Sequence, residues 1–156
     1  MQPLAESQRI IDINFTSIVH FTSEACHAMR NTGQVGVIVN IASAAGTIPI
    51  PYTPVYAATK AGVIHLTRSL GHLKASDNIR LCAIAPTYID TPMVQAIEPA
   101  MREALLRDTK GLIPIEDVVH VLMKFVTEDD HAGVVLKMVP GRVFAFPPTV
   151  KRAARL

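Results

Sequence analysis

Charge is missing from one long segment of this chain. No Asp, Glu, Lys or Arg occurs between Asn31 and Thr59, and the first charge after the gap is Lys60. Prolines at positions 49, 51 and 54 and several polar residues interrupt the gap, which excludes a membrane-spanning run. A lysine that directly follows so apolar a segment needs a specific role.

Cysteine is also scarce, and its absence limits the class of protein. Cys26 and Cys82 are the two cysteines of the chain, which fit neither a disulfide framework nor zinc-ligand spacing. The first nine residues lack the apolar core of a signal peptide. These absences predict a reducing, cytoplasmic location. The histidines have no carboxylate or cysteine ligands at suitable spacing, so no metal site is expected.

The bulk composition predicts a folded domain with a small-molecule role. Hydrophobic residues make up 49% of the 156 residues and charged residues 18%, with a net charge of +2. This composition supports a real core and excludes disorder. The small net charge does not indicate the basic surface that nucleic-acid binding requires. We expect one domain over 1–146 and a solvated basic tail over 147–156, with neither nucleic-acid nor membrane binding.

The first half of the chain predicts a helix followed by a buried strand. Residues 4–30 have an apolar helical face with a 4-3-4-3 spacing, ended by Gly33 and Gly36. This face consists of Asn14, Ile18, Phe21, Ala25 and Ala28. The run VGVIVNIAS, 35–43, is β-branched without strict alternation. That pattern is typical of a strand in a parallel sheet.

The second half repeats this alternation. A helix is predicted to start at Thr53-Pro54 and to run to 74, because proline suits the first helical position. The remaining expected elements are a buried strand at 79–86, a helical loop region at 91–110, a helix at 114–127 and a strand at 133–141. Strands that alternate with helices predict an α/β fold with a parallel sheet and right-handed crossovers.

Tyr56 and Lys60 are the first candidates for chemistry. They lie four residues apart, so they share one face of the predicted helix. A tyrosine needs its pKa of about 10 lowered to act near neutral pH. A nearby ammonium and the helix N-terminus both favour the phenolate. Lowering the pKa by three units takes about 4 kcal/mol, which two such effects in a desolvated site can supply.

Two further polar residues accompany this pair. Ser43 ends a predicted buried strand, which is where open α/β sheets place their ligand sites. Its hydroxyl could hold a substrate oxygen near Tyr56. Asn14 is a polar residue on an otherwise apolar helix face and must find partners. A water chain to Lys60 is one option, and a satisfied buried amide is the structural alternative.

Together these residues resemble the catalytic tetrad of the short-chain dehydrogenase/reductase family. Asn14, Ser43 and the pair in YAATK occur in the family's order, with 13 residues from the serine to the tyrosine. The segment APTYIDTPM, 85–93, resembles the family's loop beside the nicotinamide, and GVVLKMVPG resembles its last core strand. The overall pattern is similar to hydroxyprostaglandin-dehydrogenase-like members, and the resemblance covers about residues 3–146.

The resemblance implies a role for each residue. Tyr56 would be the general acid/base, and Lys60 would lower its pKa and hold the nicotinamide ribose. Ser43 would orient the substrate oxygen, and Asn14 would support a water relay. Cofactor contacts would come from Tyr56, Lys60, Pro86, Ile89 and Thr91. The family acts on secondary alcohols or ketones with NAD or NADP, and a homo-dimer or homo-tetramer would form through helices 4–30 and 54–74.

The chain also departs from the family pattern. The glycine-rich phosphate loop TG-x-x-x-G-x-G is absent, so the expected fold is a partial Rossmann fold. It would be the C-terminal half of a doubly wound parallel sheet, with about three strands and an open apolar edge at strand 35–42. Thr87 stands where the family usually has glycine, which crowds the nicotinamide side.

Two function classes follow from this pattern. The first is an NAD(P)-dependent oxidoreductase of the short-chain type, present here as an N-terminally truncated chain. The second is a non-catalytic association module or inactive fragment. Small residues on helix 54–74, namely Ala57, Ala58, Ala61 and Gly62, would permit close helix packing in either case.

Overall fold

Four strands form one sheet in the order β1-β2-β3-β4. The computed structural model describes residues 3–128 and 130–148. Strands β1 (Gly36–Ile41), β2 (Ile79–Pro86) and β3 (Val135–Val139) pair in parallel. The α/β fold with a mainly parallel sheet is therefore confirmed, and all three predicted strands are present.

The fourth strand was not predicted. β4 (Arg142–Phe146) runs antiparallel to β3. The chain reverses at Pro140-Gly141, where Gly141 has a φ of 71°, a conformation that glycine adopts readily in tight hairpins. The estimate of about three strands was one short, because Gly141 was interpreted only as the end of a strand.

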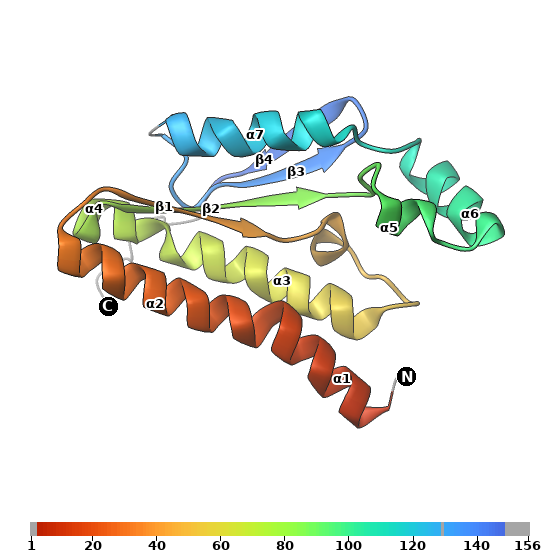
Figure 1. Ribbon diagram of the computed structural model, residues 1–156, viewed down its shortest axis with the longest axis horizontal. Coiled ribbons are helices and arrows are strands. Elements are labelled where there is room, and N and C mark those ends of the chain that lie inside the picture. The colour runs from red at the N-terminus through yellow and green to blue at the C-terminus, as the bar shows by residue number, and fades with distance from the viewer. Residues whose placement is uncertain (1–2, 129, 149–156) are drawn as a thin grey trace, which may run out of the picture.

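Helices cover both faces of the sheet (Figure 1). One continuous helical run and the helix that follows β1 lie on one face, while α7 lies on the other. The elements of the first layer are α1 (Leu4–Ile11), a π-helical turn (Asp12–Thr16), α2 (Ser17–Thr32), α3 (Pro54–Ser69), a 3₁₀ turn (Leu70–His72) and α4 (Leu73–Asp77). The others are α5 (Pro92–Gln95), α6 (Pro99–Thr109) and α7 (Ile115–Thr127).

The predicted apolar face of the first helix is wrong along α2. Phe21 is 68% exposed, whereas Thr22 and Cys26 are buried. The π-helical turn Asp12–Thr16 inserts an extra residue into the helical repeat and changes the register of the face. A regular helical period counted from Asn14 therefore assigns the wrong residues to the buried face of α2.

The predicted ends of the helices agree better with the structure. Gly33 closes α2 in the left-handed conformation with a φ of 66°. Gly36 does not end the helix, because it already belongs to β1. Pro54 is the first residue of α3, as predicted, although the Thr53 side chain makes no capping hydrogen bond.

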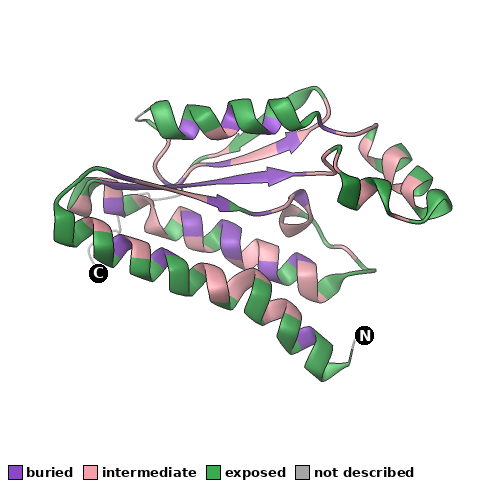
Figure 2. Ribbon diagram, in the orientation of Figure 1, coloured by how far each residue is buried: buried purple, intermediate pink, exposed green. Residues whose placement is uncertain are grey.

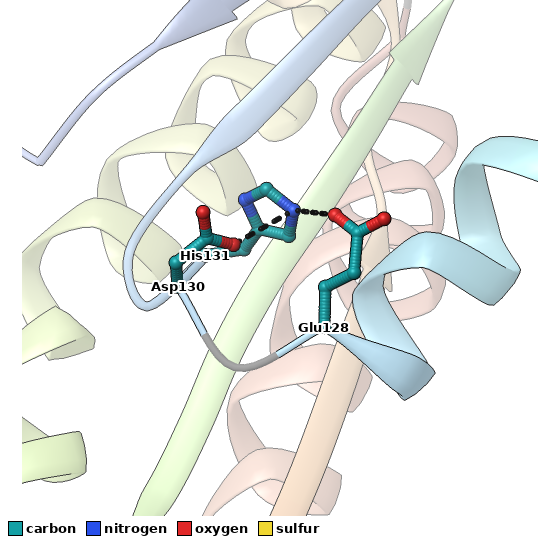
Figure 3. A group of neighbouring side chains, drawn as sticks. All are labelled: Glu128, Asp130 and His131. Atoms are coloured by element: carbon teal, nitrogen blue, oxygen red, sulfur yellow. Dashed lines mark hydrogen bonds and ion pairs between the residues drawn. The ribbon is translucent and has the colours of Figure 1, made fainter.

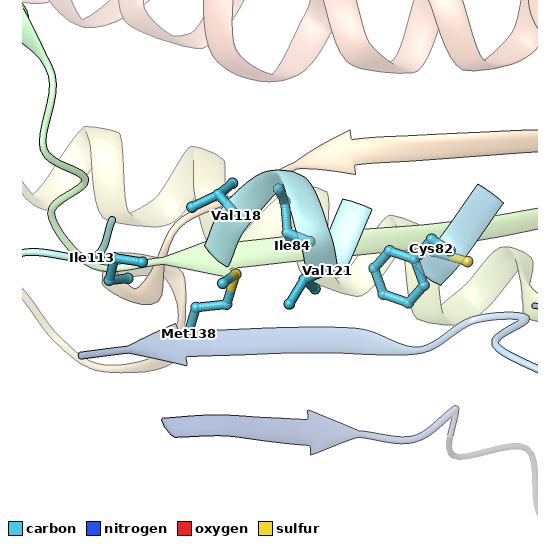
Figure 4. Close-up of a cluster of buried hydrophobic side chains, with 7 residues drawn as sticks. Cys82, Ile84, Ile113, Val118, Val121 and Met138 are labelled. Carbon is cyan, nitrogen blue, oxygen red and sulfur yellow. The ribbon is translucent and has the colours of Figure 1, made fainter. Parts of the chain in front are cut away.

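The core lies on both sides of β2, which is buried along its whole length (Figure 2). Cys82 and Ile84 face α7, where they pack with Val121, Phe125 and Met138 (Figure 4). Ala83 and Ala85 face α3 and pack against Val63 and Ile64. The alternation places small residues toward α3, so this helix sits close to the sheet.

The outer edge of β1 has no partner strand among the described residues. Ile41 at its end is 46% exposed. α7 also has an exposed apolar stripe, formed by Ile115, Val119, Met123 and Val126. An open edge beside exposed apolar side chains is the surface that the partial sheet predicts.

Neither cysteine of the described chain forms a disulfide, and both are buried. This agrees with the expected lack of a disulfide framework. Among residues 3–128 and 130–148, the helices include none with the length and hydropathy needed to cross a membrane.

Candidate active site

The predicted site residues gather at the carboxyl edge of the sheet. β1 ends just before Ser43, β2 ends at Pro86, and the first turn of α3 carries Tyr56. The turn after β1, the start of α3 and the segment leading to α5 all lie at this end of the molecule (Figure 1). Open α/β sheets bind their ligands at this edge.

Lys60 connects α3 with the end of β1. Its Nζ donates a hydrogen bond to the Ile41 carbonyl oxygen at 3.0 Å and lies 5.7 Å from the centroid of the Tyr56 ring. Partial burial lowers the pKa of the Lys60 ammonium. The first charge after the uncharged segment is therefore held beside the phenol, in a desolvated position.

Ser43 caps a short 3₁₀ turn, Ala44–Thr47. Its Oγ accepts a hydrogen bond from the Ala45 backbone N–H at 3.2 Å, which leaves the hydroxyl proton to donate elsewhere. This turn packs closely on α3 because Gly46 has no side chain. A Cβ at this position would lie 2.6 Å from the Lys60 carbonyl carbon. The turn that bears Ser43 therefore packs directly on the backbone of Lys60.

Asn14 lies in the π-helical turn. Its amide donates to the Ile10 carbonyl oxygen at 3.1 Å, so within the described chain its partner is its own helix rather than Lys60. This turn packs on α3, since the Phe15 ring fills the space left by the missing side chain of Gly62. Asn14 is thus close to α3, and the water relay remains a prediction.

The segment after β2 is fixed by backbone hydrogen bonds. The Thr87 N–H donates to the Met138 carbonyl, and the Asp90 N–H donates to the Ile113 carbonyl. Ile89 and Ile113 form an isolated parallel bridge. The Thr91 hydroxyl donates to the Ile89 carbonyl at 3.4 Å. Pro86 at the end of β2, and Ile89 and Thr91 in the loop after it, are therefore held in place at the carboxyl edge.

Thr87 contains a buried hydroxyl that has no hydrogen-bond partner within the described chain. A buried polar atom without a partner costs about 1–3 kcal/mol, so such atoms call for an explanation. The predicted departure from glycine at this position thus adds a hydrogen-bonding group as well as bulk.

Tyr88 was not among the predicted site residues. Its phenol is half-buried, and its pKa is raised by burial, by Tyr56 and by the Asp108 carboxylate, in that order. Burial is therefore the main cause of the raised pKa of this phenol. An aromatic residue two positions after a buried strand was the available signal, but the contacts predicted in this segment were Pro86, Ile89 and Thr91.

Residues 2–102 match the family model of short chain dehydrogenases. The chain belongs to this family. It is 44% identical over 104 residues to a galactitol 2-dehydrogenase of Rhizobium johnstonii. The aligned segment covers 65% of this chain and 39% of the relative. It is 31% identical over 122 residues to a mouse (Mus musculus) 15-hydroxyprostaglandin dehydrogenase [NAD(+)], over 76% of this chain and 43% of the relative.

Solved structures agree with the family assignment. A short-chain type dehydrogenase/reductase from Mycobacterium marinum has a TM-score of 0.78 at 28% identity, over 90% of this chain and 57% of that one. A dehydrogenase from Agrobacterium tumefaciens with bound NADP has a TM-score of 0.81 at 27% identity, over 90% and 59%. The chain spans about half the length of these relatives.

The short-chain dehydrogenase fold also leaves a hollow of about 480 Å³ beside α3. It is lined by Ile48, Pro49, Pro51 and the small residues Ala57 and Ala61, among others, and not by Ser43, Tyr56 or Lys60. The hollow is therefore on a neighbouring face of the helix rather than at the predicted tetrad.

One group of potential metal ligands occurs in the described residues, at the opposite edge of the sheet (Figure 3). The His131 Nε2 lies 2.9 Å from Glu128 Oε2 and 3.1 Å from Asp130 Oδ1. These contacts are those of a histidine between two carboxylates in the turn before β3. Exposed acidic groups are common without an ion, and the Glu128 contact is a hydrogen bond to the His131 ring.

Proposed function

We propose that this chain carries the acid/base half of an NAD(P)-dependent oxidoreductase of the short-chain type, which interconverts a secondary alcohol and a ketone. The observation that carries the proposal is the position of Lys60. Its ammonium bonds the end of β1 and lies beside the Tyr56 ring, in a setting where burial lowers its pKa. The names of the relatives, all dehydrogenases, support this reaction class.

In the oxidation direction, Tyr56 as phenolate takes the proton of the substrate hydroxyl. The Lys60 ammonium stabilises that phenolate, and the first turn of α3 adds the positive end of its helix dipole. Ser43 donates its hydroxyl proton in a hydrogen bond to the substrate oxygen, because its oxygen already accepts from Ala45. In the reduction direction, Tyr56 returns the proton to the ketone oxygen.

NAD or NADP would supply or accept the hydride at the carbinol carbon. The loop after β2 fits the nicotinamide end of such a group, because the buried Thr87 hydroxyl lacks a partner that a polar ring substituent could provide. Pro86, Ile89 and Thr91 of the same loop would contact the ring, and Lys60 and Tyr56 would contact its ribose.

The proposed domain over 1–146 is the C-terminal half of a Rossmann-type fold. Structural relatives are longer, with the chain covering 57–59% of them, and the glycine-rich loop for the pyrophosphate would come from the remaining half. Without that anchor the nicotinamide is poorly oriented. Since such positioning is worth about 7–11 kcal/mol, the 156-residue chain alone should show negligible turnover.

A second candidate function is association without catalysis. The open edge of β1 and the exposed apolar stripe of α7 favour it. A homo-dimer or homo-tetramer would use the helical run 4–30 and the helix 54–74, with small side chains such as Ala58 at the contact. The two buried free cysteines support a reducing, cytoplasmic location for either function.

The test is a comparison of Tyr56→Phe with Tyr52→Phe. An N-terminal half that contains the glycine loop is joined to the chain, and oxidation of secondary alcohols is followed by NAD(P)H absorbance. Tyr56→Phe should lower kcat by about 10²–10⁴-fold, because it removes the general acid/base. Tyr52, which is 92% exposed, should be replaceable without loss. A fully active Tyr56→Phe protein would contradict the assignment of Tyr56 as the general acid/base.

A further inference from the structure

Gly46 is the point at which the turn that bears Ser43 touches α3. A Cβ at Gly46 would lie 2.6 Å from the Ala61 backbone nitrogen and 2.6 Å from the Lys60 carbonyl carbon. Both are backbone atoms of a helix, so no side-chain rotation could relieve such a clash. Gly46 does not have a positive φ. The position therefore requires a missing side chain and not the backbone freedom of glycine.

Ser43 is tied to Gly46 through the hydrogen bonds of the turn. The Gly46 N–H donates to the Ser43 carbonyl oxygen at 3.0 Å, and the Ala45 N–H donates to Ser43 Oγ at 3.2 Å. The Thr47 hydroxyl closes the same turn by donating to the Ala44 carbonyl oxygen at 2.7 Å. A displacement of Gly46 therefore moves the serine hydroxyl with it.

The strand end before the turn is fixed and cannot follow such a displacement. The Ala42 N–H donates to the Ile84 carbonyl oxygen of β2 at 2.8 Å, and Lys60 Nζ donates to the Ile41 carbonyl oxygen at 3.0 Å. Lys60 thus holds this segment on both sides of the serine. Its side chain reaches the end of β1, and its backbone carbonyl meets Gly46.

The turn, rather than α3, would absorb a clash at Gly46. The two residues that flank Gly46 are half-buried and border the hollow beside α3. α3 instead buries Val63 in the core beneath it. A side chain at position 46 would therefore push the turn away from the helix and increase the distance between Ser43 Oγ and the Tyr56 phenol.

We infer that Gly46 is a positioning residue of the proposed reaction. By lacking a side chain, it sets the separation at which the Ser43 hydroxyl and the Tyr56 phenol reach the same substrate oxygen. Both groups must lie within hydrogen-bond distance of that oxygen, about 2.6–3.2 Å. The inference rests on the proposed function, since Gly46 acts through Ser43 and not on the substrate directly.

Gly36 provides the matched control. It lies at the other end of β1, and a Cβ there would meet the Met29 side chain, which is flexible and can move aside. Gly36→Ala and Gly46→Ala each add one methyl group to a tight contact. A general effect on packing would appear in both variants, whereas an effect on Ser43 should appear in Gly46→Ala and not in Gly36→Ala.

The first test measures amide hydrogen exchange by NMR in the 156-residue chain. The Ala45 N–H is protected by its hydrogen bond to Ser43 Oγ, so a displaced turn should exchange this proton about five- to tenfold faster. Gly46→Ala should show this loss of protection, and Gly36→Ala should not. Unchanged exchange of the Ala45 amide in Gly46→Ala would overturn the inference.

The second test is a double-mutant cycle on kcat in the joined protein. Gly46→Ala should lower kcat by about 10²-fold, as should Ser43→Ala, because a displacement of about 1 Å or a lost donor costs this much. In the Ser43→Ala background, Gly46→Ala should change kcat by less than about twofold, since the two residues act as a unit. Additive losses, or full activity of Gly46→Ala, would overturn the inference.

Thr47→Val is a milder perturbation of the same turn, which keeps the inference testable if Gly46→Ala does not fold. It removes the hydrogen bond to the Ala44 carbonyl without adding bulk beside α3. kcat should fall by about three- to tenfold when Ser43 is present and should not change in the Ser43→Ala background. A loss of the same size in both backgrounds, or no loss in either, would contradict the role of the turn.

The pH profile separates an effect through Ser43 from one through Lys60. If the turn moves and α3 does not, the Lys60 ammonium stays beside Tyr56, and the pH dependence of kcat in Gly46→Ala is unchanged. A shifted profile would show that the helix moved and would overturn the inference. Failure of the proposed function would instead appear as full activity of Tyr56→Phe, so the two failures are distinguishable.

Discussion

The two ends of β2 treat their buried polar groups in opposite ways. At the amino end, Arg80 is 4% exposed and donates hydrogen bonds to the backbone carbonyls of Phe125, Val126 and Glu128 at the end of α7. At the carboxyl end, the hydroxyl of Thr87 is buried without a partner in the described chain. The same strand thus buries a guanidinium that binds three backbone carbonyls at one end and a hydroxyl without a partner in the described chain at the other.

The surroundings repeat this contrast. At the amino edge, Cys82 donates its S–H to the His131 carbonyl, and Arg30 pairs with Asp77 at 2.7 Å. At the carboxyl edge, the hydroxyls of Tyr56 and Tyr88 have no hydrogen bond within the described residues. Polar groups that hydrogen-bond within the protein stabilise it, whereas groups without such a partner are available to bind a ligand. The difference separates the amino edge from the edge where we propose the binding site.

The largest expected effect comes from removing the Arg80 hydrogen bonds at the amino end of β2. Arg80→Met should lower the free energy of unfolding by about 3 kcal/mol, because several carbonyls at the end of α7 lose their donor inside the protein. Chemical denaturation measures the change. Arg107→Met is the control, since its side chain is 72% exposed, and it should change stability by no more than about 0.5 kcal/mol. Equal effects of the two substitutions would remove the contrast.

A smaller effect compares two buried threonines. The Thr67 hydroxyl accepts from the Asn40 amide at 3.1 Å and donates to the Val63 carbonyl at 2.9 Å. Thr67→Val should cost about 1–3 kcal/mol because these groups lose their partner. Thr87→Val should be neutral or stabilise by up to about 1 kcal/mol, since the lost hydroxyl has no protein partner. A destabilised Thr87→Val would indicate that the hydroxyl makes a hydrogen bond within the protein.

The smallest effect concerns acid stability at the amino edge. The Arg30 guanidinium, with help from the Ser76 hydroxyl, lowers the pKa of Asp77 from 3.8 to about 2. A lowered folded-state pKa stabilises the protein above the unfolded value, and the contribution is lost as pH falls from 3.8 toward 2. Asp77→Asn should make the free energy of unfolding less dependent on pH in this window, and Arg30→Gln should have the same effect. Chemical denaturation at a series of pH values measures this dependence. An unchanged pH dependence of stability in both variants would contradict the Arg30–Asp77 ion pair.

Much of the fold could be predicted from local pattern. The strand 79–86 matches β2 residue for residue, because a short, mainly apolar run after a helix has few alternatives. The start of α3 at Pro54 follows from the fixed φ of proline. The register of α2 could not be predicted, because a π-helical turn at Asp12–Thr16 leaves no clear mark in the sequence.

The candidate site divides in the same way. Tyr56 and Lys60 could be paired from spacing alone, since residues four apart on a helix are neighbours. The position of Tyr88 could not, because its loop is held by backbone hydrogen bonds to Ile113, which is far away along the chain. β4 was missed for a related reason: its pairing depends on the open edge of β3.

The sequence by itself determined the α/β order, the ends of β2, the start of α3 and the tyrosine–lysine pair, because each depends on residues that are close along the chain. The predicted end of this helix at 74 was wrong, since α3 ends at Ser69. The tertiary structure alone decided that Lys60 reaches the Ile41 carbonyl of β1 and that Arg80 caps α7. These contacts join residues 19 and 45 positions apart. Strand order and helix placement bring them together, and no local period encodes either one.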